Sequence, residues 1–245
     1  MTEAAADLSF DLAIADRDLP DLAARLKREG HLRVENALPP ASAQALNHEL
    51  STTSLWNRSF HQGGTERHIH AEELARLSPA QRTAIERFAL IGPDDGFFFL
   101  HDAIRIAESG EERLRRGLLI DRLVETINQE RNIAILRRIT GEPEIRYYKA
   151  DATRYNQGDF CGLHSDMAHD KNRIAAVIFY LSERWVANWG GLLMFHDEQG
   201  DIWRALTPRF NAMHMLKVPQ QHSVSQVSQL APFPRYSVAG WLYSE

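Results

Sequence analysis

The spacing of apolar residues divides this chain into two parts with different periodicities. Up to about residue 143, apolar residues recur every three or four positions, which is the period of one face of an α-helix. One such pattern ends at Gly30 and another, which begins near residue 111, ends at Gly141; glycine often terminates helices. A short strand over 31–37 and a helix over 39–50 lie between them. The first part is therefore predicted to be mainly helical.

From residue 144 onward, short runs rich in β-branched and aromatic residues are separated by Gly, Pro and Asn. Seven segments are predicted to be strands: 145–156, 173–181, 190–197, 202–208, 211–219, 222–228 and 236–243. Such a density of strands is typical of an antiparallel sandwich or barrel, for example a jelly roll. No repeat or low-complexity linker separates the two parts. The sequence therefore predicts one α+β domain over 1–245, with a mainly helical support over 1–143 and an all-β core over 144–245.

Composition and charge exclude several classes of protein. The chain has 44% hydrophobic and 25% charged residues, as soluble globular proteins do, and its net charge of −5 disfavours a general affinity for nucleic acid. The longest apolar run, 175–181, is too short to span a bilayer. The acidic N-terminal segment is unlike an export signal, and the single cysteine, Cys161, permits no internal disulfide. A cytoplasmic protein without membrane partners is therefore expected.

A metal site is predicted around the segment FCGLHSD at 160–166. If this segment ends a strand, side chains two residues apart point to the same side, so His164 and Asp166 can reach one ion together. His-x-Asp triplets are common by chance, so a third ligand has to come from elsewhere. His222, at the start of a later predicted strand, is the candidate. Two histidines and one carboxylate leave open positions on a metal, as in non-haem Fe(II) oxygenases.

The last predicted strand suggests a site for an anionic cosubstrate. Arg235 and Ser237 share one face of that strand because side chains alternate along it. A guanidinium inside a β-barrel is costly unless it meets an anion, and its planar fork suits a carboxylate. A keto diacid fits these requirements: one end chelates the metal, and Arg235 holds the far carboxylate. Ser237 adds one more hydrogen bond.

Together these residues resemble the signature of Fe(II)- and 2-oxoglutarate-dependent dioxygenases. The segments RYNQGDFCGLHSD, VIFYLSERW, GGLLMF, HSV and PRYSVAGWLY are similar to prolyl-hydroxylase-type members, including the oxygen-sensing branch, in order and spacing. The resemblance covers about 147–243 and implies the double-stranded β-helix fold. It also implies that His164, Asp166 and His222 bind Fe(II) and that O₂ and 2-oxoglutarate are the cosubstrates.

The resemblance assigns further residues and an outcome of the reaction. Arg235 would bind the distal carboxylate of 2-oxoglutarate, Tyr155 matches a tyrosine that hydrogen-bonds the cosubstrate, and Tyr180 matches one that lines the same pocket. Halogenating relatives have a small residue in place of Asp166, so hydroxylation, coupled to decarboxylation of 2-oxoglutarate to succinate, is expected. The collagen-type branch has Lys in place of Arg235, and the spacing from His222 to Arg235 is a few residues longer than in the oxygen sensors.

The substrate and two other functions stay open. The hydroxylated group belongs to a prolyl or other residue of a protein or peptide, to a free amino acid or to a small molecule. A non-redox cupin-like protein would use a similar site to bind Zn²⁺ or a ligand, and a nucleic-acid oxidative demethylase would share the iron core. The anion receptor at Arg235 disfavours the first, and the acidic net charge disfavours the second. The polar segment 60–70 is predicted to be either a lid or an inert loop.

Overall fold

The computed structural model describes residues 8–62, 65–90, 97–167 and 172–244. In this part of the chain, twelve strands form one antiparallel sheet in the order β1-β10-β7-β12-β5-β4-β6-β11-β8-β9, with β2 paired to β4 and β3 paired to β2. The strand bounds are His31–Val34 (β1), Asn57–Gln62 (β2), Thr65–Ile69 (β3), Phe99–Arg105 (β4), Tyr147–Tyr155 (β5), Phe160–His164 (β6), Arg173–Tyr180 (β7), Leu193–His196 (β8), Ile202–Leu206 (β9), Ala212–Lys217 (β10), His222–Val224 (β11) and Arg235–Tyr243 (β12).

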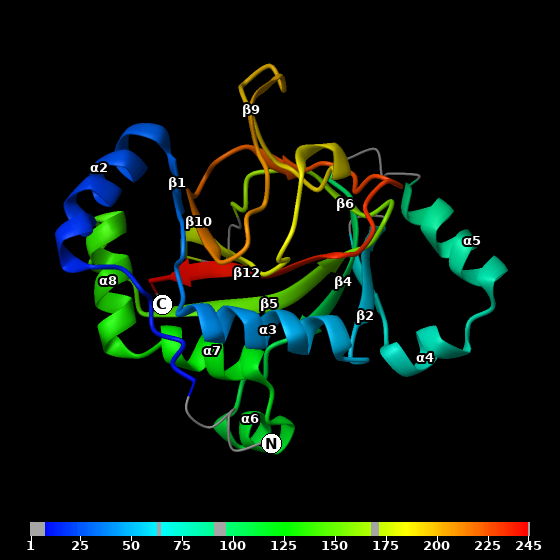
Figure 1. The fold of residues 1–245 in the computed structure, drawn as a ribbon. Helices are drawn as coiled ribbons and strands as arrows, with labels where there is room; N and C mark the ends of the chain where they lie inside the picture. The colour runs from blue at the N-terminus through cyan, green and yellow to red at the C-terminus, as the bar shows by residue number, and fades with distance from the viewer. Residues whose placement is uncertain (1–7, 63–64, 91–96, 168–171, 245) are drawn as a thin grey trace.

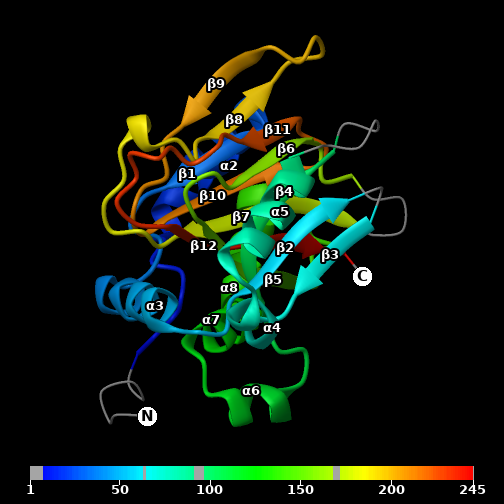
Figure 2. The same ribbon diagram turned by 90° about the vertical axis from the view of Figure 1, so that its right-hand side faces the viewer.

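The sheet curls, so that β5, β7 and β12 form a floor that faces β6, β8 and β11 (Figures 1 and 2). A hydrophobic cluster that includes residues of β7, β8 and β10 closes one end of this half-barrel: Ala176, Leu193, Phe195 and Leu216. The predicted fold class, a jelly-roll core within an α+β chain, is confirmed. Each of the seven segments predicted to be strands coincides with a strand of the sheet, although β12 begins one residue before its predicted segment.

Alternation along β5 and β12 separates the outer core from the inner cleft. Tyr148, Ala150 and Ala152 of β5 are buried on the outer face, against the helices, and Val238 and Leu242 of β12 join them. The residues between them point to the opposite face because side chains alternate along a strand. One face of the floor therefore supports the core, and the other supplies the polar groups of a cleft.

Helices cover the outer face of the floor, with α3 and α7 beneath β12 and β5 and with α2 and α8 side by side (Figure 1). The helix bounds are Leu19–Glu29 (α2), Pro40–Thr52 (α3), Ala71–Arg76 (α4), Pro79–Leu90 (α5), Gly110–Arg116 (α6), Leu119–Ile127 (α7) and Glu130–Thr140 (α8), with 3-10 turns at Asp16–Asp18 (η1) and Ala187–Trp189 (η2). None of the helices in the described ranges has the length and apolarity that crossing a bilayer requires.

The α7 helix shows why this packing forms. Ile120, Leu123, Val124 and Ile127 recur at spacings of three, one and three, which places them on one buried face. Burial of each such side chain stabilises the fold by roughly 1.5–3 kcal/mol. The α2 and α8 helices end at Gly30 (φ 72°) and Gly141 (φ 75°), as predicted, because glycine adopts the left-handed conformation of a helix C-cap without strain.

Two expectations for the first part of the chain were wrong in detail. The segment from about 111 to 140 is three helices rather than one, because the chain turns at Gly117 and again at 128–129. The segment 60–70 is not a free loop: its described residues belong to the β2–β3 hairpin, which is paired through β2 to β4. The division of a single domain near residue 143 stays a prediction, and β1 to β4 show that residues before it also contribute strands to the sheet.

Candidate active site

A cleft of about 1310 Å³ lies between the floor and the opposite strands of the curled sheet. Its lining includes side chains from β4, β5, β7 and β12 on one side and from β6, β8 and β11 on the other. All seven residues that the sequence marked as site residues line this cleft: Tyr155, His164, Asp166, Tyr180, His222, Arg235 and Ser237.

Three potential metal ligands converge at one end of the cleft. His164 ends β6 and His222 begins β11, and these two residues are direct partners in the antiparallel pairing of the strands. Their ring centroids lie 4.1 Å apart. Asp166 follows two residues after β6, and its carboxylate lies 3.5 Å from His164 Nε2 and 3.4 Å from His222 Nε2. One ligand atom from each residue lies within 4.8 Å of the other two, so the three can share an ion.

Backbone carbonyls orient both imidazoles toward this point. His164 Nδ1 lies 2.9 Å from the Gly162 carbonyl oxygen, and His222 Nδ1 lies 2.7 Å from that of Gln220. Each Nδ1–H can therefore donate outward, which leaves the Nε2 lone pair directed at the shared point; carbonyl partners of this kind are usual for metal-ligating histidines. Asp166 has a left-handed backbone conformation (φ 60°), which is uncommon outside glycine and typical of functional sites.

The protonation states of Asp166 and His222 suit metal binding. Burial opposes ionisation of Asp166, but the hydrogen bond from His164 and the charge of both imidazoles lower its pKa. Burial lowers the pKa of His222 to about 4, and the neighbouring His164 adds to this effect. For His164, burial is outweighed by Cys161 and Asp166, which raise its pKa. Two imidazole nitrogens and one carboxylate form the donor set of non-haem Fe(II) centres, so these residues fit an iron ion.

Arg235 lies deeper in the cleft as a buried cation without a counterion. Only 2% of the residue is exposed, and its guanidinium carbon lies 4.8 Å from the ring centroid of Tyr155 and 4.7 Å from that of Tyr180. Among the described residues no carboxylate forms an ion pair with it, and its Nε has no hydrogen-bond partner. A buried charge of this kind is costly unless an anion joins it, so the site fits the distal carboxylate of 2-oxoglutarate.

Comparison with known proteins agrees with this geometry. A sequence model of the 2OG-Fe(II) oxygenase superfamily matches residues 150–243, which span β5 to β12 and hold every residue of the candidate site. Over these residues the chain is similar to the 2OG-Fe(II) oxygenase superfamily. Together with the three converging ligands, the match supports a 2-oxoglutarate-dependent non-haem iron oxygenase that uses Fe(II), 2-oxoglutarate and O₂. No curated protein matches the chain.

Solved structures share the fold of this oxygenase at low sequence identity. A prolyl-4-hydroxylase from Pseudomonas putida is 16% identical, with 92% of this chain and 98% of that chain covered and a TM-score of 0.56. A 2OG-Fe(II) oxygenase family oxidoreductase from Burkholderia pseudomallei is 13% identical, covers 96% of both chains and has a TM-score of 0.58. A Trichoplax adhaerens prolyl hydroxylase, solved with a hypoxia inducible factor peptide fragment, is 15% identical over 93% of this chain and 90% of that chain, with a TM-score of 0.57.

The remaining predicted residues surround Arg235 of the oxygenase. Tyr155 is its partner in the pairing of β5 with β12, while Ser237 pairs with Tyr180 on β7. The Ser237 hydroxyl lies 2.7 Å from the Thr153 hydroxyl, so it has a hydrogen-bond partner within the protein. These positions are consistent with the roles in cosubstrate binding predicted for Tyr155, Tyr180 and Ser237, and the roles themselves stay predictions.

Sequence reasoning missed His101, on β4. Its ring stacks on Tyr155 with centroids 5.0 Å apart and lies 4.9 Å from the ring of Phe99. Burial lowers the pKa of His101 to about 3, so the imidazole is neutral near pH 7. Alternation along 99–105 would have predicted that the His101 side chain shares a face with residues 99, 103 and 105. The alternation is hard to recognise in the sequence, because the run FFFLHDAIR is mostly apolar with only a few polar residues.

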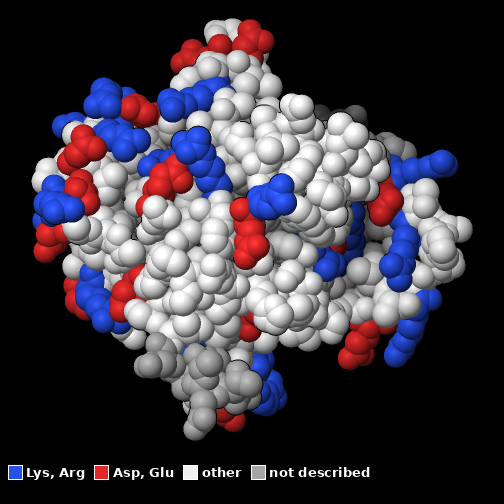
Figure 3. All heavy atoms as spheres, viewed as in Figure 1, with Lys and Arg blue, Asp and Glu red and all other residues white. Residues whose placement is uncertain are grey.

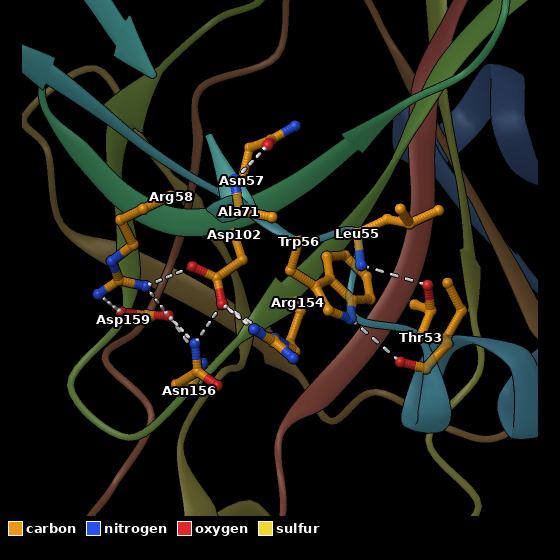
Figure 4. Close-up of polar contacts among 11 residues, drawn as sticks. Thr53, Leu55, Trp56, Asn57, Arg58, Ala71, Asp102, Arg154, Asn156 and Asp159 are labelled. Carbon is orange, nitrogen blue, oxygen red and sulfur yellow. Dashed lines mark hydrogen bonds and ion pairs between the residues drawn. The ribbon is translucent and has the colours of Figure 1, made fainter. Parts of the chain in front are cut away.

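A buried ionic network ties the β2–β3 hairpin to the strand that carries His164 (Figure 4). Arg58, on β2, donates to both oxygens of Asp159 at 2.8 and 2.5 Å and to Asp102 at 3.1 Å. Arg154 and Asn156 donate to the second oxygen of Asp102 at 2.9 and 2.8 Å. Asp159 directly precedes β6. The hairpin, whose residues Ser59, Glu66 and His68 line the cleft, is therefore fixed relative to the candidate metal ligands.

Proposed function

We propose that this oxygenase is a hydroxylase in which His164, Asp166 and His222 hold Fe(II) and Arg235 holds 2-oxoglutarate. The observation that supports it most is the unpaired guanidinium of Arg235, which faces the same cleft as the three potential ligands. When bound, iron supplies activation of O₂, coupled to oxidative decarboxylation of 2-oxoglutarate to succinate and CO₂. A metal site without a cosubstrate would not need this buried anion receptor.

The residues around the cosubstrate have separate roles in this proposal. Arg235 fixes the distal carboxylate through a charge-assisted fork of hydrogen bonds. The rings of Tyr155 and Tyr180 lie over the guanidinium and exclude water from it, which strengthens its attraction for the carboxylate. Ser237 and Thr153 line the adjoining wall. The carboxylate of Asp166 occupies a position on the metal, and this favours hydroxylation over halogenation.

The substrate proposed for this enzyme is a prolyl or other residue of a protein or peptide, or a free amino acid or small molecule. The Trichoplax relative was solved with a peptide fragment, and another fold relative is SnoN, an α-ketoglutarate-dependent epimerase from nogalamycin biosynthesis. Nucleic acid is a less suitable substrate, because Lys and Arg are interspersed with Asp and Glu on the face seen in Figure 3. The cytoplasmic location proposed for the enzyme rests on the single cysteine.

A turnover screen tests the proposed function. The purified protein, loaded with Fe(II), is incubated in air with 2-oxoglutarate and with pools of peptides or free amino acids, and succinate is measured. We expect succinate to exceed the iron-free control and to increase with a substrate that gains the mass of one oxygen atom. An iron-loaded protein that forms no succinate with any pool would contradict the proposal.

A further inference from the structure

Asp151 presents a carboxylate to the cleft on the strand next to the candidate metal site. The inward-facing residues of β5 all line the cleft: Tyr147, Lys149, Asp151, Thr153 and Tyr155. Asp151 is paired with Ala239 of β12, and Trp241 follows on the same face of that strand. Arg173 lies over the Trp241 ring at 3.8 Å and donates to the Asp166 carbonyl oxygen at 3.2 Å. Asp151 thus lines the same cleft as the three potential ligands.

The cations nearest to Asp151 are engaged by other groups. Lys149 pairs with Glu108, outside the cleft lining. Arg105, the cross-strand partner of Asp151 on β4, directs Nη2 at His68 Nε2, 3.2 Å away. Arg173 is held between the Trp241 ring, the Asp166 carbonyl and the Tyr243 hydroxyl. In the described ranges of the chain Asp151 forms no ion pair within 4.0 Å.

The carboxylate is also poorly satisfied by hydrogen bonds. It accepts one bond, from the Ile106 backbone N–H at 3.3 Å. Burial raises the pKa of Asp151, although the Ile106 hydrogen bond and the charges of Arg105 and Lys149 act in the opposite direction. Asp151 is half-buried, and a cation that enters the cleft would form the ion pair that this carboxylate lacks among the described residues. Four residues further along the same two strands, Tyr147 and Tyr243 stack with centroids 5.0 Å apart and add aromatic faces to the lining of the cleft.

We propose that Asp151 binds a cationic side chain of the substrate, so that the hydroxylated molecule is a lysyl or arginyl residue of a peptide or the corresponding free amino acid. The proposal rests on the function proposed above and narrows its substrate class. The cation would pair with the Asp151 carboxylate within the cleft that the candidate iron ligands also line. Asp151 is then a residue that determines specificity.

Peptides that differ only in one central residue test this assignment. The iron-loaded protein with 2-oxoglutarate receives peptides with Lys, Arg, norleucine or Glu at that place, and free lysine and arginine distinguish the two sources of the cation. We expect the Lys or Arg forms alone to raise succinate above the peptide-free level and to gain one oxygen atom. Norleucine matches lysine without its charge, so an equal or better response to norleucine or to Glu would overturn the proposal.

A binding measurement without turnover keeps the test independent of catalysis. The fluorescence anisotropy of a labelled lysyl peptide gives its Kd for the wild type, for Asp151→Asn and for Asp201→Asn, which removes a charge on the exposed β8–β9 turn. We expect Asp151→Asn to weaken binding at least about tenfold and Asp201→Asn to leave it unchanged. Equal affinity in all three proteins would overturn the role of Asp151. Absence of succinate in every reaction, with selective lysyl-peptide binding retained, would instead contradict the proposed hydroxylase function.

Discussion

Arg235 is the residue at which folding and function conflict most clearly. Its guanidinium is buried between two tyrosine rings and has no counterion among the described residues, so it costs stability in the free protein and becomes favourable when an anion binds. Because side chains alternate along a strand, the sequence alone predicted that Arg235 and Ser237 share one face. The hydrogen bond between the Ser237 and Thr153 hydroxyls could not be predicted, because it joins two strands that are far apart in the sequence.

Replacing Arg235 with Met separates these two effects. Met fills a similar volume without charge, so we expect the apo variant to melt at the same temperature as the wild type or higher. Its affinity for 2-oxoglutarate should fall by roughly 2–4 kcal/mol, or about 30- to 1000-fold, since a charge-assisted pair is lost. Thermal denaturation with and without 2-oxoglutarate measures both. Iron content serves as the control and should be unchanged; an apo variant much less stable than the wild type would contradict the unpaired-cation interpretation.

Among the elements, strands with a clear alternation or a long apolar run were predicted, whereas the largely polar β2–β3 hairpin was not. The predicted segments contain β5 and β7 and cover β12 except for Arg235. The β2–β3 hairpin was missed because β3 is largely exposed and β2 buries Arg58 and Ser59, whose burial depends on partners elsewhere in the chain. Only the folded chain shows that Asp102 and Asp159 neutralise Arg58.

The Arg58 network makes a prediction about how two elements depend on each other. Arg58→Met leaves Asp102 and Asp159 buried without this partner, so we expect a loss of about 3–5 kcal/mol in the free energy of unfolding, measured by urea denaturation. Because Asp159 precedes β6, iron affinity should fall as well. The control is Arg33→Met, which removes a partly exposed pair with Glu35 and should cost less than about 1 kcal/mol. Similar losses in both variants would contradict the structural role assigned to the network.

The molecule as a whole should be labile to acid because several histidines are buried in neutral form. Burial lowers the pKa of His101 and of His214 to about 3, and it also lowers the pKa of His31. The unfolded chain protonates these groups near pH 6.5, whereas the folded protein does not. The stability they contribute is therefore complete above about pH 6.5 and is lost as the pH falls toward 3, by up to about 1.4 kcal/mol per pH unit for each histidine.

Denaturation of the metal-free protein between about pH 7 and pH 5 measures this dependence. His214→Gln removes one of these groups, so the decline in stability with falling pH should be shallower by about one histidine's share. His70→Gln changes an exposed histidine and should leave the decline as in the wild type. A stability that is constant over this range would contradict the burial of neutral histidines.

The fold class was predictable because the strand density after residue 144 is a local property. The convergence of His164, Asp166 and His222 was predictable from the alternation of side chains and from the resemblance, and their role as iron ligands stays a prediction. The environment of Asp151 could not be predicted from the sequence. Asp151 forms no ion pair among the described residues because Glu108, His68 and Trp241 hold the neighbouring cations Lys149, Arg105 and Arg173. That depends on the arrangement of the whole half-barrel.

The proposed function requires that 2-oxoglutarate and Fe(II) bind in the same cleft. Anaerobic addition of Fe(II) and then 2-oxoglutarate to the purified protein measures this directly, because a keto acid chelated to Fe(II) absorbs visible light. We expect a charge-transfer band that saturates with 2-oxoglutarate in the wild type, that needs far more 2-oxoglutarate in Arg235→Met, and that is absent when His164 and His222 are both replaced by Ala. An iron-loaded wild-type protein that gives no band at saturating 2-oxoglutarate would contradict the shared binding of Fe(II) and 2-oxoglutarate.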